Sequence, residues 1–227
     1  MARTKTSAKG RSGGAKGPVA APPRRRPTQE RSQRRFEAIV SAAAESFARF
    51  GFGETTMEGI AAAAQTSIGS VYQFFPNKRA VFREVAMRCM ALSRRSYAEL
   101  LGPDPLSQPW HALLERFIDG FRGLHERSVV MQAVWRNLEL YGEYAEADQA
   151  LLRELVDATS ALFAGWLPAL DPGRRRVVAT MLVNTVASMM LVLVREDDEA
   201  LGDAIVQETK RMLVRYLAEY LGEPDQG

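Results

Sequence analysis

The amino-acid sequence predicts an all-α protein. Apolar residues recur every three or four positions through most of the chain, which is the spacing of a helix with one buried face. Residue types that favour helices dominate, and no strong run of alternating β-branched residues indicates a strand. Hydrophobic residues make up 46% of the 227 residues. That content is enough for a real core, divided between two small domains or held in one large one.

Charge is distributed unevenly along the chain. Residues 1–27 carry eight basic residues and no acidic one, and they are rich in Gly, Ala, Pro and Ser. Such a segment cannot bury enough apolar surface to order itself, so residues 1–27 are predicted to be a disordered basic tail. Residues 91–227 carry fourteen basic and twenty-one acidic residues. Positive charge is therefore concentrated at the N-terminal end, which favours a polyanionic partner there.

The first helix is expected to begin near Gln29–Ser32 and to end near Phe50. Its apolar residues fall on one face. Gly51 follows at the position where helices commonly end in glycine. The helix therefore presents one side to a core, and the chain turns immediately after it.

Residues 54–78 predict two short helices joined by a tight turn. Thr56 is a good N-cap for the first of them, and the apolar residues after it form one stripe. Ser67 can cap a second helix that runs to about Phe74. Pro76 stops that helix, because the residue before a proline is pushed away from the α region.

The outer side of the second short helix is thin, because it carries small residues such as Gly69 and Ser70. A thin helix can enter the major groove of DNA, and its N-terminal N–H groups favour phosphates. Gln73 is the favoured base-contacting residue, since an amide can pair bidentately with adenine. The residues expected to contact DNA, with Thr56 and Lys78 placed on phosphates and the three arginines in the tail, are Thr56, Ser67, Gly69, Ser70, Tyr72, Gln73, Phe74, Lys78, Arg24, Arg25 and Arg26.

Residues 34–86 resemble the DNA-binding domain of the tetracycline-repressor (TetR) family of bacterial transcription regulators. Gln65 departs from the family pattern, which usually has a glycine in the turn, and Thr66 stands where the family usually has an aliphatic residue. The matching residues are Ile39, Ala42–Ala44, Phe47, Gly51, Phe52, Thr55, Thr56, Ile60, Ala61, Ser67, Gly69, Ser70, Val71, Tyr72, Phe75, Pro76, Asn77 and Lys78.

The resemblance implies two domains after the tail. Residues 28–77 would form a three-helix, helix-turn-helix DNA-binding domain, and residues 78–227 a helical effector-binding and dimerisation domain. The periodicity agrees with this division, because it predicts a helix over 78–101 and a breaker at 102–105. Five further helices are then predicted over 109–127, 128–141, 145–167, 172–194 and 200–221.

Seven aromatic residues and one methionine of the C-terminal half are candidates for an effector pocket, which suits a hydrophobic or flat ligand. Aromatic residues at helical spacing also commonly form core, and that alternative remains open. The candidates are Trp110, Phe117, Phe121, Met131, Trp135, Tyr141, Phe163 and Trp166.

The last two predicted helices are apolar around much of their circumference. Such helices need cover on both sides, and a partner subunit would provide it through a four-helix, two-fold interface. The alternative is that helix 172–194 is the central core helix of a monomer. The expected interface residues are Met181, Leu182, Thr185, Met189, Val192, Met212, Leu213, Tyr216, Leu217 and Tyr220.

No feature of the sequence predicts an enzyme, a cofactor or a metal site. The two histidines, His111 and His125, lie fourteen residues apart without a pattern of metal ligands, and there is no phosphate-binding loop or nucleophile elbow. No apolar run reaches the ~20 residues of a membrane span, there is no signal-peptide core, and the single cysteine, Cys89, suits a reducing cytoplasm.

The sequence therefore predicts a cytoplasmic, nucleoid-associated bacterial repressor that binds a palindromic operator as a homodimer. A small effector would favour a dimer with wrongly spaced DNA-binding domains and so release the operator. Two alternatives are a ligand sensor that no longer recognises DNA, and a nucleoid-like basic protein that binds all sequences equally.

Overall fold

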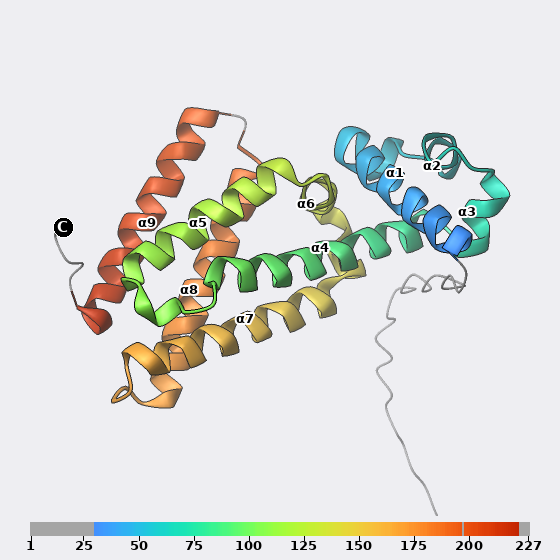
Figure 1. Ribbon diagram of the computed structural model, residues 1–227. Helices are drawn as coiled ribbons and strands as arrows, with labels where there is room; N and C mark the ends of the chain where they lie inside the picture. Colours follow the sequence, from blue (N-terminus) through green and yellow to red (C-terminus); the bar gives the residue numbers. More distant parts are fainter. Residues whose placement is uncertain (1–29, 197, 223–227) are drawn as a thin grey trace, which may run out of the picture.

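The computed structural model describes residues 30–196 and 198–222, and within these ranges every regular element is helical (Figure 1). Three helices, α1–α3, lie together at one end of the molecule. The long helix α4 leads from them toward the other end, where α5, α7, α8 and α9 gather. The all-α prediction is confirmed. The predicted tail, residues 1–27, lies outside the described residues.

The first three helices are α1 (Glu30–Glu54), α2 (Met57–Ala63) and α3 (Ile68–Phe74), and α4 follows at Lys78–Leu101. Gly51 interrupts α1 with a φ of 75°, so the helix proper ends at Phe50, as predicted. Asn77 caps α4 because its side chain accepts a hydrogen bond from the backbone N–H of Ala80 at 2.9 Å.

The first core joins α1–α3 to the first half of α4 and to α6. Aromatic rings dominate its centre: Phe47 lies 5.4 Å from Phe82 and 5.7 Å from Phe52, between ring centroids. Since side chains from α4 fill this core, α1–α3 are packed directly onto α4. The predicted boundary between residues 77 and 78 stays a prediction.

The sixth helix is shorter than the sequence predicts. The structure has α5 at Trp110–Arg127 and α6 at Val129–Trp135, after which a 3-10 helix, η2, covers Leu138–Glu143. A single helix over 128–141 was expected, and that expectation is wrong. The buried side chain of Asn137 gives the physical reason, because it bonds to the end of α1 as well as to its own helix.

Three long helices complete the fold: α7 (Ala145–Trp166), α8 (Pro172–Leu193) and α9 (Glu199–Leu221). A short 3-10 helix, η1 (Pro105–Ser107), precedes α5 and contacts α7. The second core lies among α5, α7, α8 and α9. Its apolar side chains hold these four helices together away from the helix-turn-helix.

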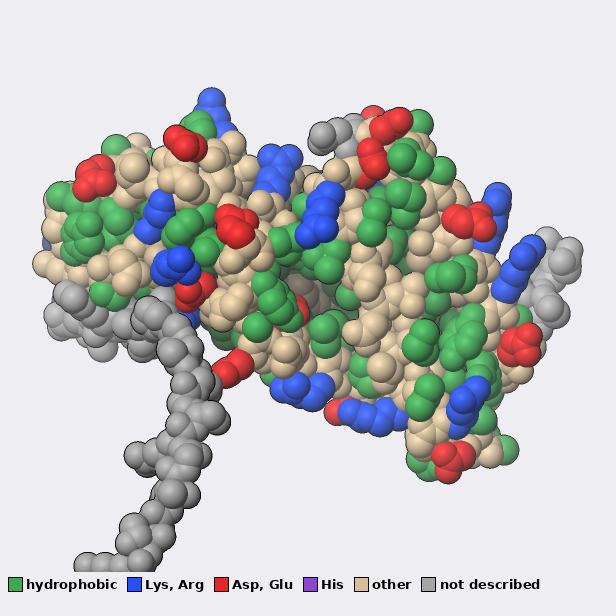
Figure 2. Space-filling view, turned by 180° about the vertical axis from the view of Figure 1, so that it is seen from behind, with side chains coloured by type: hydrophobic (Ala, Val, Ile, Leu, Met, Phe, Trp, Pro, Cys, Tyr) green, Lys and Arg blue, Asp and Glu red, His purple; other side chains and the backbone are tan. Residues whose placement is uncertain are grey.

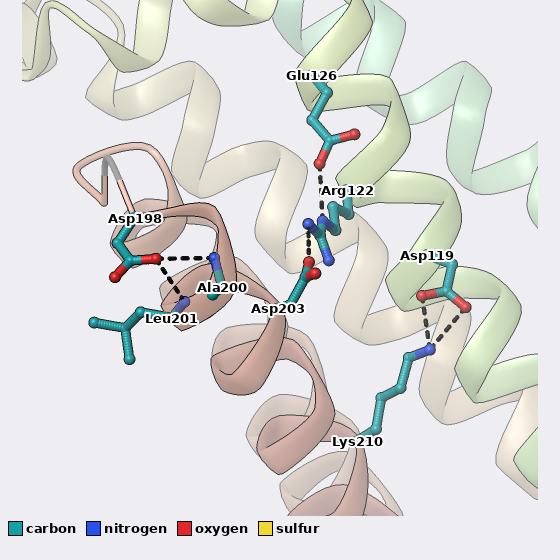
Figure 3. A network of polar contacts seen from close by, with 8 residues as sticks. All are labelled: Asp119, Arg122, Glu126, Asp198, Ala200, Leu201, Asp203 and Lys210. Carbon is teal, nitrogen blue, oxygen red and sulfur yellow. Dashed lines mark hydrogen bonds and ion pairs between the residues drawn. The ribbon is translucent and has the colours of Figure 1, made fainter.

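Charged groups fasten α9 to α5 (Figure 3). Lys210 of α9 lies 2.7 Å from the carboxylate of Asp119, and Arg122 of α5 lies 2.5 Å from Asp203 and 2.8 Å from Glu126. Asp198 begins α9 by accepting hydrogen bonds from two backbone N–H groups of the first turn. These pairs sit at the edge of the second core.

One helix among the described residues, α8, is long and apolar enough by length and composition to cross a membrane. In the folded chain it packs along α7 and α9, and Val178, Ala179, Met189 and Met190 are buried in those contacts. The apolar residues of α8 therefore pack against α7 and α9 in the folded chain.

Candidate DNA-binding surface and ligand cavity

Thr56 begins α2 as predicted, since its Oγ1 accepts a hydrogen bond from the backbone N–H of Gly59 at 3.0 Å. Gly59 is unusual inside a helix, where glycine costs roughly 1 kcal/mol relative to alanine. A Cβ at this position would lie 3.2 Å from Thr56 Oγ1. The glycine therefore leaves room for the cap.

The turn between α2 and α3 has the hydrogen bonds of a Schellman motif. The N–H of Thr66 donates to the carbonyl of Ala61 at 2.9 Å, and the N–H of Gln65 donates to that of Ala62 at 3.0 Å. Gln65 has a φ of 50°, which is the left-handed region that glycine favours. Gln65 thus adopts the backbone conformation expected of the glycine that the family usually has here.

Ser67 begins α3 as predicted. Its Oγ accepts from the N–H of Ser70 at 3.2 Å and lies 2.8 Å from Ser70 Oγ. The two hydroxyls therefore fix the first turn of a helix with only seven residues.

The outer face of α3 is open to solvent. Tyr72 is 42% exposed and Gln73 is exposed, as are Ser67 and Gly69, while Ser70 is half-buried. The structure adds Ile68, whose side chain is 36% exposed on the same helix. Ile68 is not among the predicted contacts, because an aliphatic side chain suggests core. An apolar group here could contact a thymine methyl.

Gly69 is not required by the packing of the chain. A Cβ at this position would meet only Ser67 Oγ, at 4.0 Å. Packing within the chain therefore does not require glycine here, and the missing side chain keeps the outer face of α3 thin.

Phe74 does not face outward, and the expectation that it contacts DNA is wrong. Its side chain is 3% exposed, and its ring packs edge-on against Phe36 of α1 with centroids 5.6 Å apart. Val71, three residues earlier, is fully buried. Residues at i and i+3 share a helix face, so Phe74 follows Val71 inward.

Lys78 has a different role from the one predicted. Its ammonium donates to the carbonyl of Gly53 at 3.2 Å, to that of Thr55 at 2.5 Å, and to that of Phe52. The same nitrogen lies 4.3 Å from the centre of the Phe52 ring. With three N–H donors committed, Lys78 fastens the α1–α2 connection to the start of α4 and does not stand free for a phosphate. Arg24, Arg25 and Arg26 lie outside the described residues.

A cavity of about 550 Å³ lies in the other half of the molecule, between α4, α5, α7 and α8. The face of the molecule drawn in Figure 2 is also hollowed near its middle, with hydrophobic side chains around the hollow. All eight predicted pocket residues line the cavity: Trp110, Phe117, Phe121, Met131, Trp135, Tyr141, Phe163 and Trp166. The structure thus brings them to one place, although ligand binding by them stays a prediction.

Few polar groups face this cavity. The hydroxyls of Tyr97 and Thr159 lie 2.9 Å apart and satisfy each other, and burial raises the pKa of Tyr97. The Tyr141 hydroxyl donates to Asp148 at 3.1 Å. His125 also lines the cavity, and its pKa is lowered because burial disfavours the imidazolium. A ligand would meet an apolar wall with isolated polar positions.

The predicted interface residues separate into two groups. Met189, Leu213 and Leu217 are 5%, 2% and 2% exposed, because they pack inside the second core of a single chain. The expectation that Leu213 and Leu217 contact a partner directly is wrong, whereas Met189 also lines the groove between α8 and α9, so its contact with a partner stays a prediction. Met181, Val192 and Met212 are about half exposed, at 53%, 49% and 51%. Leu182, Thr185, Tyr216 and Tyr220 are half-buried.

A shallow groove between α8 and α9 connects several of the exposed positions. The residues along it are Met181, Asn184, Thr185, Ser188, Met189, Val192, Ile205 and Thr209. An exposed face of this composition on two neighbouring helices is typical of a surface that another molecule covers.

Asn137 connects the cavity region to the helix-turn-helix. Its Nδ2 donates to the carbonyl of Phe47 at 3.2 Å and of Ala133 at 2.7 Å, and its Oδ1 accepts from the N–H of Phe52 at 2.6 Å. Arg136 also donates to a carbonyl of α1, that of Ala48, at 3.2 Å. Both residues directly follow α6, which contributes Met131 and Trp135 to the cavity wall.

Two comparisons of sequence bear on this arrangement. A family profile described as "Bacterial regulatory proteins, tetR family" matches residues 39–85, and one described as "Tetracyclin repressor-like, C-terminal domain" matches residues 109–217. The HTH-type transcriptional regulator RutR of Escherichia coli is 26% identical over 149 residues, covering 58% of this chain and 61% of that protein.

An uncharacterised HTH-type transcriptional regulator of Bacillus subtilis, YhgD, is 27% identical over 123 residues, covering 54% of this chain and 59% of that protein. The matches thus span about three fifths of the length of these curated relatives.

Solved structures share the fold. A TetR-family regulator from Pectobacterium atrosepticum superposes with a TM-score of 0.64 at 16% identity, over 87% of this chain and 100% of that one. A transcriptional regulator from Cytophaga hutchinsonii gives a TM-score of 0.63 at 20% identity, over 82% of this chain and 97% of that one.

Proposed function

The chain belongs to the TetR family of transcriptional regulators, and we propose that it is a repressor which binds a palindromic operator as a homodimer and leaves it when a small effector binds. The family is not enzymatic. We further propose that the protein works in the cytoplasm, on the nucleoid.

The observation that carries this proposal is the outer face of α3. Ser67, Gly69, Tyr72 and Gln73 are exposed there, while Val71 and Phe74 anchor the opposite face in the first core. An anchored helix with a thin polar surface suits insertion into the major groove. The hydroxyls of Ser67 and Ser70 are hydrogen-bonded to each other, so they stabilise the start of the helix. The side chains that contact bases and phosphates are therefore those of Tyr72 and Gln73.

A dimer places two such helices in successive major grooves about 34–36 Å apart, which requires a two-fold related operator. The α8–α9 face supports this step, because Met181, Val192 and Met212 expose apolar surface beside the groove that those helices form. A partner's α8 and α9 would cover that surface in a two-fold arrangement.

Release by an effector needs a physical link between the cavity and α3. The link we propose is the segment 131–137, where Met131 and Trp135 line the cavity and Asn137 is bonded to the end of α1. An effector that displaces Trp135 would shift Asn137 and, with it, the helices packed on α1. The effector then favours the form that does not fit the operator, and by reciprocity DNA weakens effector binding.

Selection of bound sequences from a random DNA pool, with the full-length protein, tests the proposal. A two-fold symmetric consensus that is bound roughly 10³-fold more tightly than unrelated DNA is expected. The variant Gln73→Ala should lose preference at one position of each half-site, by about 1–3 kcal/mol. A matched control is Gln149→Ala, an exposed glutamine on α7 far from α3 in the chain, which should leave the consensus unchanged.

Two results would contradict the proposal in different ways. Equal affinity for all sequences would indicate a nucleoid-like protein, whereas no DNA binding together with tight ligand binding would indicate a sensor that has lost DNA recognition. A monomer at micromolar concentration in sedimentation would overturn the dimer and, with it, the symmetric operator.

A further inference from the structure

The cavity is apolar apart from a few groups, and one of those groups is a carboxylate without a cationic partner. Asp148 is the acidic residue in the cavity lining, and it forms no ion pair with any described residue. Its side chain accepts a hydrogen bond from the Tyr141 hydroxyl at 3.1 Å. A half-buried charge in an apolar hollow is costly unless something compensates for it.

Helix capping does not explain this carboxylate, although it lies in the first turn of α7, where the helix dipole favours an acidic residue. Asp171 and Asp198 accept hydrogen bonds from the backbone N–H groups that begin α8 and α9, so they serve as helix caps. The side chain of Asp148 makes no such bond, and its own backbone N–H donates to the carbonyl of Tyr144 at 2.9 Å. Asp148 is therefore inside α7 and not capping it.

Aromatic residues share the cavity wall with the carboxylate. Tyr141 of η2 and Tyr144, just before α7, lie edge to face with their ring centroids 5.2 Å apart, and both line the cavity. Trp135 lines the same cavity. His125 packs on Trp135 at 5.1 Å. Faces of aromatic rings attract cations as a carboxylate does.

The electrostatics agree with a missing positive charge. Burial raises the pKa of Asp148, and the hydrogen bond from Tyr141 opposes that only in part. Arg195 is the one arginine in the cavity lining; it is exposed, and it forms no ion pair with Asp148. An anionic ligand placed near Asp148 would be repelled by it.

We propose that the effector is a hydrophobic cation, such as a lipophilic amine or quaternary ammonium compound, and that its positive group binds beside Asp148 among Tyr141, Tyr144 and Trp135. This inference rests on the proposed function, because it assigns a chemical class to the ligand of the same cavity. The apolar part of the ligand would fill the space lined by Phe117, Phe121, Phe163 and Trp166.

The test is a displacement experiment in which only the head group of the ligand changes. The neutral fluorescent probe N-phenyl-1-naphthylamine is bound to the full-length protein, and it is then displaced by decyltrimethylammonium, decanol or decanoate. The cationic chain is expected to displace it at a concentration about tenfold lower than decanol, and decanoate to be the weakest. In Asp148→Asn the cationic preference should fall to less than about threefold.

Two further variants keep the result interpretable. Asp148→Glu retains the charge and should retain the preference for the cationic chain. Glu146→Gln removes an exposed carboxylate two residues away on the same helix, outside the cavity lining, and should change nothing. Thermal unfolding of each variant checks that the fold is intact.

The possible failures are distinct. Equal displacement by all three chains, or a preference that survives Asp148→Asn, would overturn the cationic assignment and leave the effector cavity in place. If the probe does not bind at all and none of the chains alters the fluorescence of Trp110, Trp135 or Trp166, the cavity takes no such ligand, and effector release falls together with this inference.

Discussion

The two cores of the protein differ in how completely they are filled. In the first core, Ile39, Phe47, Val71, Phe75 and Phe82 are all 0% exposed, and their rings and branches close around one another. The second core borders a cavity of about 550 Å³ whose wall includes large aromatic residues, and Met90, Met131, Tyr144 and Leu151 of the first core complete that wall. A filled core fixes one geometry, whereas a hollow one can be completed by another molecule.

This contrast separates two tasks within one chain. The helix-turn-helix must hold α3 in a fixed position, because a small displacement would spoil its fit to the major groove. The cavity region must remain responsive, and unfilled space makes a region easier to rearrange when a ligand supplies the missing contacts. The junction at Asn137 is where the two kinds of packing meet.

The largest expected effect comes from removing a ring from each core. Phe47→Ala empties a site enclosed by Phe52 and Phe82, and it should lower the free energy of unfolding by about 3–5 kcal/mol. Phe117→Ala only enlarges an existing cavity, so its cost should be about 1–2 kcal/mol. Urea unfolding followed by circular dichroism compares them directly.

Phe117→Ala should also weaken binding of a neutral hydrophobic probe. Phe47→Ala should not do so by direct contact, because Phe47 lies in the first core and does not line the cavity. Equal losses of stability in the two variants would contradict the contrast between a filled and a hollow core. In that case the cavity would be occupied or collapsed in solution.

Asn137 should give the next largest effect. In Asn137→Ala the part-buried N–H of Phe52 loses its acceptor, and a donor left without a partner there should cost about 1–3 kcal/mol. If the junction couples the two regions, effector binding should then release operator DNA less effectively, while the intrinsic affinity of the cavity changes little. Titration of ligand with and without operator measures both.

Arg136→Gln is the matched control for this junction. It removes a single bond from an exposed residue to the Ala48 carbonyl, so both stability and coupling should change less. If the effector still releases operator DNA from Asn137→Ala as effectively as from the unaltered protein, the cavity and α1 are coupled through another contact between α6 and α1.

Local chemistry determined which features were predictable from sequence. Thr56 and Ser67 cap their helices as expected, because capping depends on the residue and its next three neighbours. Phe74 and Lys78 were misplaced, since their roles depend on Phe36 and on the carbonyls of Phe52 to Thr55, which the fold brings together from far along the chain.

The same reasoning applies to the C-terminal half. The apolar pattern of α9 identified a helix that needs cover on more than one side, but it did not say which side is covered by the chain itself. Leu213 and Leu217 face the second core, whereas Met212, one position earlier, faces outward. Deciding between them needs the positions of α5 and α8, and local periodicity does not contain these.

Gly69→Ala tests whether the thin surface of α3 exists for DNA. The new methyl group has open space within the protein, so helix stability should rise, by up to about 1 kcal/mol. Operator affinity should fall by about tenfold, or about 1.4 kcal/mol, because the methyl group enters the space that DNA would occupy. Thermal unfolding and a fluorescence binding assay measure the two effects.

Gly53→Ala is the comparable change outside α3, since a Cβ there meets nothing within 4 Å. It should leave operator binding unchanged. If Gly69→Ala binds the operator as well as the unaltered protein does, α3 does not approach DNA as closely as we propose.

The smallest effect is expected at the turn, where Gln65 holds a φ of 50°. A left-handed conformation costs a residue with a side chain about 1–2 kcal/mol. Glycine avoids that cost but loses about 0.5–1 kcal/mol through the greater freedom of the unfolded chain. Gln65→Gly should therefore stabilise the protein by roughly 0.5 kcal/mol, raising the midpoint of thermal unfolding slightly.

Because the hydrogen bonds of the turn run between backbone atoms of Ala61, Ala62, Gln65 and Thr66, the substitution should preserve them and leave operator preference unchanged. Gln65→Ala serves as the control, since it removes the same amide but keeps the Cβ, and it should bring no comparable gain. A loss of stability in Gln65→Gly would mean that the glutamine side chain contributes a contact worth more than the strain of its backbone, and the turn would then be held by more than its Schellman hydrogen bonds.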